Sequence, residues 1–383
     1  MKTPIKNYRN VTAVDSAFWA RSRNRDPRSR VTPKPKYFNT NERPGSWSIK
    51  IFSMLAIAFF AVPHGQAQKT RVQLPIIDMH IHAEPLSEFG GGETSVCIGD
   101  ESKVFQAIDP KSSLGLKDLM KCRNPIKSSA TDEKLLTETL GMFTRLNIRR
   151  AVTAGPLDLV SKWYAASPKR VIKALSFADR DRTPAEFRRL YSEGKFSVFA
   201  EVGMQYRGLS PDDELYEPYF ALAEELDIPI GLHMGEGPPG GIHTVGPPTY
   251  LVAMGRPLLL EKVLVRHPNL RVYVMHYGSP FVDEMIAMLF SHPNLYVDIA
   301  CNNWLSPRKQ FYEHLRKLVD AGFEKRILFG SDQMAWPGTI SKAVEAVNRA
   351  PFLTRSQKRD ILYDNAARFL RLSKAEIARD HER

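Results

Sequence analysis

Short apolar runs rich in β-branched residues recur eight times after residue 70, and this repetition most limits what the chain can fold into. Several of the runs are almost continuously apolar, which is typical of parallel strands that are covered on both faces. Strand followed by helix, repeated in this way, predicts a closed (β/α)8 TIM barrel of the α/β class. The expected strands are Leu74–His80, Ile148–Ala154, Val171–Phe177, Ser197–Val202, Ile228–His233, Arg271–His276, Leu295–Ala300 and Arg326–Phe329.

Stretches with helical periodicity separate most of these runs. Thr354 is followed three residues later by Gln357, a capping-box pattern that predicts the start of a helix. Ser210 followed by Pro211 predicts another start, because proline is favoured at the first helical position. The expected helices are Asp132–Leu146, Pro211–Leu226, Pro280–Phe290, Arg308–Ala321, Ile340–Ala350 and Thr354–Leu372.

An open doubly wound sheet is the alternative architecture, and it would gather its ligands at a single switch point. Polar candidates follow several different strands here, which favours the barrel. The segment from Ala83 to Thr131 is long for a connection and rich in glycine and serine. Loops of this length in a compact domain are usually functional, so we expect a lid-like insertion after strand 1.

Metal-binding residue types end five of the apolar runs. His80 and His82 are two residues apart, so in a strand they point to the same side. Two imidazoles at the end of a strand form half of a site for zinc, iron or manganese. A barrel gathers its strand ends on one rim, where burying imidazoles and carboxylates without a cation would be costly. The residues expected to form this centre are His80, His82, Glu201, His233, His276 and Asp332.

This ordered set resembles the amidohydrolase superfamily, and most closely its amidohydrolase-related branch. The similarity spans roughly residues 74–372, including the segments Phe329–Asp332 and Leu362–Leu370. The resemblance makes His276 either a further metal ligand or a catalytic residue. The ligands of a divalent metal that it implies are His80, His82, His233 and Asp332.

Glu201 departs from the pattern of many superfamily members, which carry a carboxylated lysine at the end of strand four to bridge two metals. The segment Ala200–Tyr206 is similar instead to the strand-four motif of TatD-type nucleases, in which glutamate is a ligand. Glu201 is therefore expected either to bind metal in a two-ion site or to orient a ligating histidine in a one-ion site. Zinc is the ion that we expect from this donor set.

Metal-assisted hydrolysis of an amide, ester or lactone bond in a small molecule is the activity that these residues predict. Asp332 is expected to accept the proton of the attacking water, and His276 to polarise the substrate or transfer a proton. The main alternative is a metal-dependent decarboxylase of an aromatic or unsaturated acid, and a less favoured one is a non-catalytic exported metal-binding protein. Loops at the barrel mouth choose substrates, and the contacts expected there are Glu236, Arg207, Trp304 and Trp336.

The first 67 residues predict export. Residues 1–50 hold twelve lysines and arginines against three acids with little periodicity, so we expect a disordered basic leader. Residues 51–67 combine an apolar run with a small-residue cleavage site, as in a signal peptide, and the run is too short to span a bilayer. The barrel, residues 68–383, is then expected to be periplasmic or secreted, without a stable membrane anchor.

The residues after the leader carry only +3 of the net charge of +12. This small excess argues against a nucleic-acid partner, so we expect a small-molecule substrate. A homo-oligomer is left open. Cys97 and Cys122 lie in the same insertion and could pair in an exported protein or remain free thiols. Cys301 has no base partner in sequence, which argues against a cysteine nucleophile.

Overall fold

The computed structural model describes residues 74–91, 93–101, 121–240 and 250–382, all within one compact unit, Lys69–Arg383. The predicted leader and signal peptide, residues 1–67, lie outside the described residues. Among the described helices, none is both long enough and apolar enough to cross a membrane.

Eight parallel strands form the centre of the described fold and confirm the predicted barrel. Their order in the sheet follows the chain, β1-β4-β5-β6-β7-β8-β9-β10. The two ends of this order meet through the segment after β10, where the Met79 N–H donates to Phe329 O over 2.9 Å, so the barrel is nearly closed. The strands are β1 (Ile76–His82), β4 (Ile148–Ala154), β5 (Val171–Leu175), β6 (Val198–Val202), β7 (Ile230–His233), β8 (Val272–Met275), β9 (Leu295–Asp298) and β10 (Ile327–Leu328).

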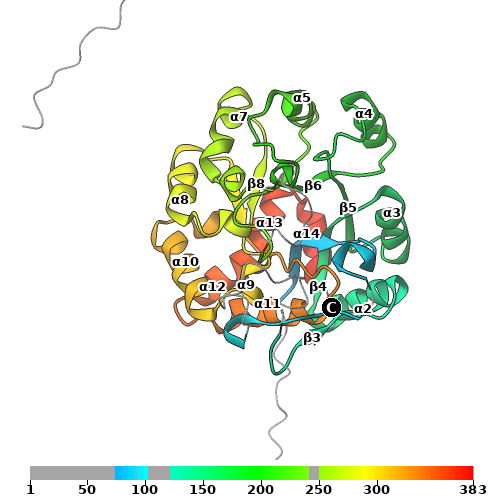
Figure 1. Ribbon diagram of the computed structural model, residues 1–383, viewed down its shortest axis with the longest axis vertical. Coiled ribbons are helices and arrows are strands. Elements are labelled where there is room, and N and C mark those ends of the chain that lie inside the picture. Colours follow the sequence, from blue (N-terminus) through cyan, green and yellow to red (C-terminus); the bar gives the residue numbers. More distant parts are fainter. Residues whose placement is uncertain (1–73, 92, 102–120, 241–249, 383) are drawn as a thin grey trace, which may run out of the picture. The chain divides into compact units, whose positions relative to one another are not determined.

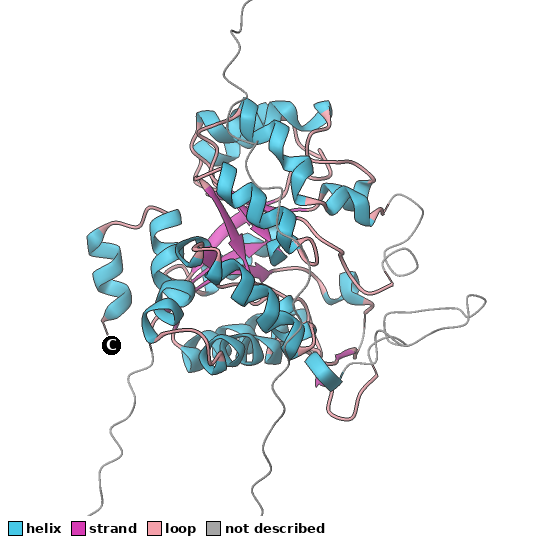
Figure 2. Cartoon of the chain, turned by 90° about the vertical axis from the view of Figure 1, so that its left-hand side faces the viewer, coloured by secondary structure: helices cyan, strands magenta, loops and turns pink. Residues whose placement is uncertain are grey.

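Helices form an outer ring around these strands, as Figure 1 shows down the short axis and Figure 2 from the side. The longer helices turn an apolar stripe inward; α2, for example, buries Leu135, Met142 and Phe143. The helices are α2 (Asp132–Leu146), α3 (Leu157–Ala166), α4 (Pro184–Ser192), α5 (Glu217–Glu225), α7 (Glu261–Arg266), α8 (Val282–Ser291), α9 (Asn302–Leu305), α10 (Arg308–Asp320), α11 (Gly338–Arg349), α12 (Arg355–Arg359), α13 (Asn365–Phe369) and α14 (Lys374–His381).

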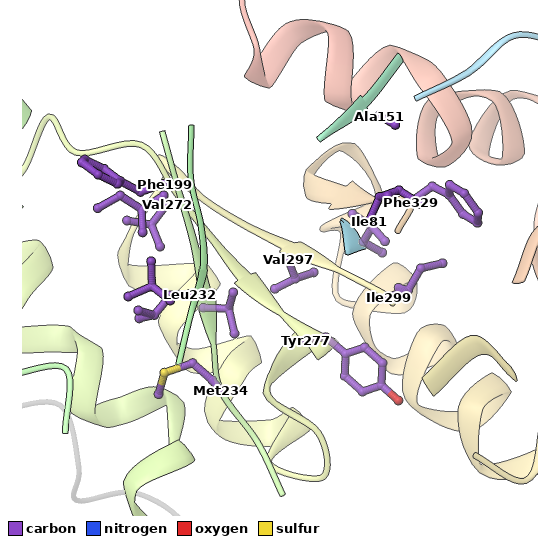
Figure 3. Close-up of a cluster of buried hydrophobic side chains, with 14 of the residues drawn as sticks. Ile81, Ala151, Phe199, Leu232, Met234, Val272, Tyr277, Val297, Ile299 and Phe329 are labelled. Carbon is purple, nitrogen blue, oxygen red and sulfur yellow. The ribbon is translucent and has the colours of Figure 1, made fainter. Parts of the chain in front are cut away.

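The strands separate two apolar clusters, because successive side chains of a strand face opposite sides. In β6, Phe199 belongs to the cluster shared with the helices, whereas Val198 and Ala200 belong to the smaller cluster inside the barrel. Figure 3 shows part of the outer cluster, including Leu232 of β7 and Val297 of β9. The barrel interior is thus a packed core, and chemistry is confined to its ends.

The amino-terminal ends of the strands are covered by α13. The Asn365 amide donates to Ile327 O over 2.7 Å, and Arg271 donates to Phe369 O over 2.7 Å. Phe369 is also buried in the interior cluster. The opposite end of the barrel, at the carboxyl ends of the strands, is the end that can hold a functional site.

Two helix predictions were wrong in part. The helix expected from Pro211 begins at Glu217, because Ser210 hydrogen-bonds the nearby Asp212 carboxylate and Asp213 caps a short 3-10 helix, Glu214–Tyr216. The capping box of Thr354 is confirmed. The helix behind it runs on through a π-helical turn at Asp360–Asp364 into α13, and it ends at Phe369 instead of Leu372.

The insertion after β1 is described only in part, because residues 102–120 lie outside the described residues. Its two short strands, β2 (Ser95–Val96) and β3 (Ile126–Lys127), pair antiparallel. Cys97 and Cys122 form a disulfide, which settles the choice between paired and free thiols. A lid over the barrel mouth stays a prediction.

Candidate metal centre

The structure brings together the six residues that the sequence pointed to, at the carboxyl ends of five strands. His80 and His82 end β1, Glu201 lies in β6 and His233 ends β7; His276 follows β8 and Asp332 follows β10. Three overlapping groups of their side chains could each hold a metal ion: His80–His82–Glu201, His80–His276–Asp332 and Glu201–His233–His276. The cluster is buried, and its largest relative exposure on any histidine is 8%.

Glu201 lies at the centre of this cluster. Its Oε2 is 3.0 Å from His80 Nε2 and 3.3 Å from His82 Nε2. Its Oε1 contacts His233 Nδ1 and lies 3.5 Å from His276 Nε2. The two carboxylate oxygens thus contact different pairs of histidines: Oε2 lies near His80 and His82, and Oε1 lies near His233 and His276.

His82 and Asp332 show that the donor set fits a cation. His82 Nε2 and Asp332 Oδ1 are 2.9 Å apart, but their geometry is not that of a hydrogen bond. Both atoms are buried and have no hydrogen-bond partner, which is costly for polar atoms. Buried nitrogen and oxygen atoms that lie this close without hydrogen bonds of normal geometry are donors that a metal ion of the zinc or manganese type could bind.

Without a metal, the cluster would hold protons instead. Burial lowers the pKa of His80, but the Asp332 and Glu201 carboxylates outweigh burial and raise it to about 10. Burial raises the pKa of Asp332, but the nearby His80 and His82 outweigh it and lower that pKa to about 2. Metal binding must then displace protons from imidazoles, so we expect the affinity for metal to rise with pH.

The metal-free protein should lose stability at alkaline pH. The pKa of His80 is about 10 when folded and 6.5 ordinarily, so its contribution is complete below pH 6.5 and lost as the pH rises through 10. We expect the thermal midpoint measured in chelator to fall between pH 6.5 and 10, and to fall less with zinc present. Equal midpoints at pH 6 and pH 9.5 in chelator would contradict this assignment.

Backbone in the left-handed region aims the residues that lie beyond the strand ends. His276 has φ 57° and Asp332 has φ 53°, values that non-glycine residues rarely adopt. Long-range bonds hold them there: the Asp332 N–H donates to His80 O over 2.8 Å, and the His276 N–H donates to an Asp298 oxygen over 2.7 Å. Residues with rarely adopted backbone angles are frequent at functional sites.

Three supporting side chains were not expected from the sequence in these roles. Asp298, at the end of β9, accepts a hydrogen bond from His80 Nδ1 over 3.1 Å. The Gln333 side chain makes two hydrogen bonds to the backbone of His82: it donates to the carbonyl over 2.7 Å and accepts from the N–H over 2.9 Å. Tyr206 Oη lies 3.1 Å from His233 Nε2. Each of them orients a histidine of the cluster from behind, as partners of metal ligands do.

The residues expected to contact substrate lie in different environments. Glu236 is mostly buried; its Oε1 accepts from the Ser279 hydroxyl over 3.2 Å, while its Oε2 is buried without a hydrogen-bond partner. Burial raises the pKa of the Glu236 carboxyl. Arg207 is about half exposed and pairs with Asp179.

Both tryptophans are almost completely buried. Trp304 belongs to the outer core and donates its indole N–H to Ser331 O over 2.7 Å. Trp336 packs 6.1 Å from the ring of Phe89, whose ring lies the same distance from that of His82. Its indole nitrogen is buried and has no hydrogen-bond partner. Trp336 is thus separated from the cluster by one side chain, whereas the polar atom of Trp304 is already occupied.

The chain is similar in sequence to one protein family and in fold to several solved structures. The model of the amidohydrolase family matches residues 77–372. Among curated proteins, none matches the chain. The solved structures with a similar fold include an uncharacterized TIM-barrel protein from Bordetella bronchiseptica, with a TM-score of 0.51 and 20% identity over 64% of this chain and 85% of that one.

Two further solved structures carry names that describe an activity. One is a probable 2-pyrone-4,6-dicarboxylic acid hydrolase from Acinetobacter baumannii, with a TM-score of 0.50 and 13% identity over 78% of this chain and 100% of that one. The other is a dihydroxybenzoic acid decarboxylase from Polaromonas with bound manganese, with a TM-score of 0.51 and 14% identity over 79% of this chain and 98% of that one. At such identities the likeness shows the barrel fold alone. The family model, in contrast, runs from β1 to the residues after α13, and the chain belongs to the amidohydrolase family.

Proposed function

We propose that the protein is a metal-dependent hydrolase that cleaves an amide, ester or lactone bond of a small molecule. The observation that carries the proposal is the buried cluster in which His82 Nε2 and Asp332 Oδ1 lie 2.9 Å apart without a hydrogen bond of normal geometry. A bound divalent metal would supply a Lewis acid and a water of lowered pKa. Zinc is the ion that nitrogen and oxygen donors of this kind favour.

The placement of Glu201 supports a site for two ions. Oε2 would serve one ion together with His80, His82 and Asp332, and Oε1 would serve the other together with His233 and His276. The ring of His276 is oriented for ligation, because its Nδ1 donates to Ala300 O over 3.2 Å and leaves Nε2 facing the cluster. In a one-ion site the same nitrogen would instead be placed to hand a proton to the leaving group.

Replacing Glu201 by glutamine should separate these two arrangements. The amide has one oxygen in place of two equivalent ones, so it cannot serve both sides of the cluster. We expect the wild-type protein to hold about two zinc ions per chain and the Glu201→Gln variant about one, measured by plasma mass spectrometry. One ion in the wild type would contradict the two-ion site and make His276 the proton donor.

We infer that Asp332 is the general base. Its carboxylate is buried, and the pKa lowered to about 2 keeps it ionised at neutral pH. It approaches His82 and lies 3.8 Å from His80, so a water held by these residues would be within reach of its free oxygen. It can accept that water's proton as the bond to the substrate carbonyl forms.

The charges around the cluster favour hydrolysis over decarboxylation. In the described part of the chain, the ion pairs of Glu201, Asp298 and Asp332 involve histidines and no lysine or arginine. Arg207 is turned to Asp179. The carboxylate of an aromatic acid would find no lysine or arginine among these pairs, whereas a neutral amide, ester or lactone needs no such partner.

A paired assay of the full chain tests the proposal. The zinc-loaded protein is offered panels of neutral lactones, esters and amides, and in parallel a panel of hydroxybenzoic acids. We expect turnover in the first panel only. For esters and lactones it is measured by the proton released, and for amides by the amine released. Release of carbon dioxide from the acids, with no turnover of the neutral compounds, would overturn the proposal in favour of a decarboxylase.

A further inference from the structure

Asp298 connects the two sides of the cluster through one buried carboxylate. It is completely buried at the end of β9. Its Oδ2 accepts from His80 Nδ1 over 3.1 Å. Its Oδ1 accepts from two backbone amides, that of His276 over 2.7 Å and that of Ala300 over 3.0 Å.

Gly330 leaves space for the contact between Asp298 and His80. Gly330 lies against Asp298, and a Cβ at that position would come within 3.3 Å of Asp298 Oδ2 and 2.8 Å of His80 Cβ. A side chain at residue 330 would therefore push His80 away from the carboxylate. The missing Cβ is what lets the imidazole approach Asp298 so closely.

The chemistry of this contact fixes where the proton of His80 lies. An ionised carboxylate has acceptors only, so the contact requires a hydrogen on His80 Nδ1. Nε2 faces Glu201 over 3.0 Å and also holds a proton while no metal is bound. A metal that binds at Nε2 takes the place of that proton and leaves the hydrogen on Nδ1. The opposite tautomer would present an N–H to the metal position and could not ligate.

We propose that Asp298 is a positioning residue that sets the ring tautomer of His80 and so makes Nε2 available to the metal. The inference rests on the proposed metal centre, but not on the reaction performed there. The same carboxylate also orients His276, since it holds the His276 backbone amide and the peptide of Ala300, whose carbonyl accepts from His276 Nδ1. One buried group thus sets a histidine on each side of Glu201.

The Asp298→Asn variant tests this role. The Asn oxygen can still accept from the two backbone amides, so the fold is kept, and its NH2 group then faces His80 Nδ1. An amide donor in that place forces the proton of a neutral His80 onto Nε2. We expect zinc affinity, measured by competition with a chelator, to fall about 10–100-fold, as for other partners of metal ligands.

Asp78→Asn is the matched control. Asp78 is equally buried beside His80, and its Oδ1 accepts from the backbone amides of His80 and Ser331 over 3.1 and 2.9 Å. Among the described residues, no imidazole is hydrogen-bonded to its carboxylate. We expect this variant to keep wild-type zinc affinity. Equal losses of affinity in both variants would show that buried charge near β1 matters only for the fold, and would overturn the proposal.

Nitrogen-15 NMR of the histidine rings gives a readout that a merely structural role would not move. In the zinc-loaded wild type we expect His80 Nδ1 to carry a proton and Nε2 to be ligated; in metal-free Asp298→Asn we expect the neutral ring protonated on Nε2. His80 bound through Nδ1 in the wild type would overturn the proposal even if the variant failed to fold. A protein that binds zinc as described but hydrolyses none of the panel would refute the proposed function and leave this inference standing.

Discussion

Replacing Asp332 by asparagine should reduce kcat by about 10²–10⁴-fold, the usual contribution of a general base. Asparagine keeps the shape of the side chain and one oxygen, but it cannot accept a proton at neutral pH. The Asp332 backbone N–H still donates to His80 O, so the local fold is expected to persist. The loss should therefore appear in kcat at full metal loading rather than in stability.

Steady-state kinetics on the best substrate of the neutral panel, with zinc content measured on the same samples, checks this expectation. Asp283→Asn is the matched control, because it removes the same charge from an exposed residue that pairs with Lys317 on the surface. Wild-type kcat in a fully zinc-loaded Asp332→Asn variant would remove Asp332 from the proton transfer.

Replacing both His80 and His82 by alanine should abolish metal binding. Both imidazoles face Glu201 Oε2 from one strand, and His82 also has two buried nitrogens without hydrogen-bond partners. Loss of an outer partner alone costs about 10–100-fold in affinity, so loss of two ligands should exceed about 100-fold. The alanines also remove the His80 and His82 partners of Asp332 and of Glu201 Oε2, which leaves the repulsion between the two carboxylates less compensated.

Plasma mass spectrometry on the full chain, after equilibration with zinc and removal of the excess, provides the measurement. The control is His314→Ala, because His314 lies on α10 with Tyr277 as its neighbour and has no contact with the cluster. Zinc retained by the double variant at the level of this control would exclude β1 as the source of ligands.

The strands could be predicted from the sequence because apolar runs between polar connections are a local signal. β4 and α2 have the predicted bounds, and the other strands differ from prediction only at their ends. Those ends matter for the site, however. His276 was expected to close a strand, but it lies beyond β8 in a left-handed conformation that a contact with Asp298, 22 residues away, stabilises.

The residues that support the ligands could not be predicted in the same way. Asp298 ends an apolar run, a signal like that of His233, but the run was taken to continue to Ala300, which hid the end of the strand. The surroundings of Trp304 also depend on a distant segment: its indole N–H donates to the carbonyl of Ser331, which follows β10. Both Asp298 and Trp304 owe their roles to hydrogen-bond partners that lie far away in the chain.

The closing of the barrel has a consequence for how the protein assembles. His82 and Gln333 are held together by two hydrogen bonds although 251 residues separate them, and Asp332 is bonded to His80 at the same place. Bringing such distant segments together costs loop-closure entropy, which contacts at this seam must offset. The site is therefore complete only in a chain that has been synthesised to its last strand, and shorter translation products should have no competent centre.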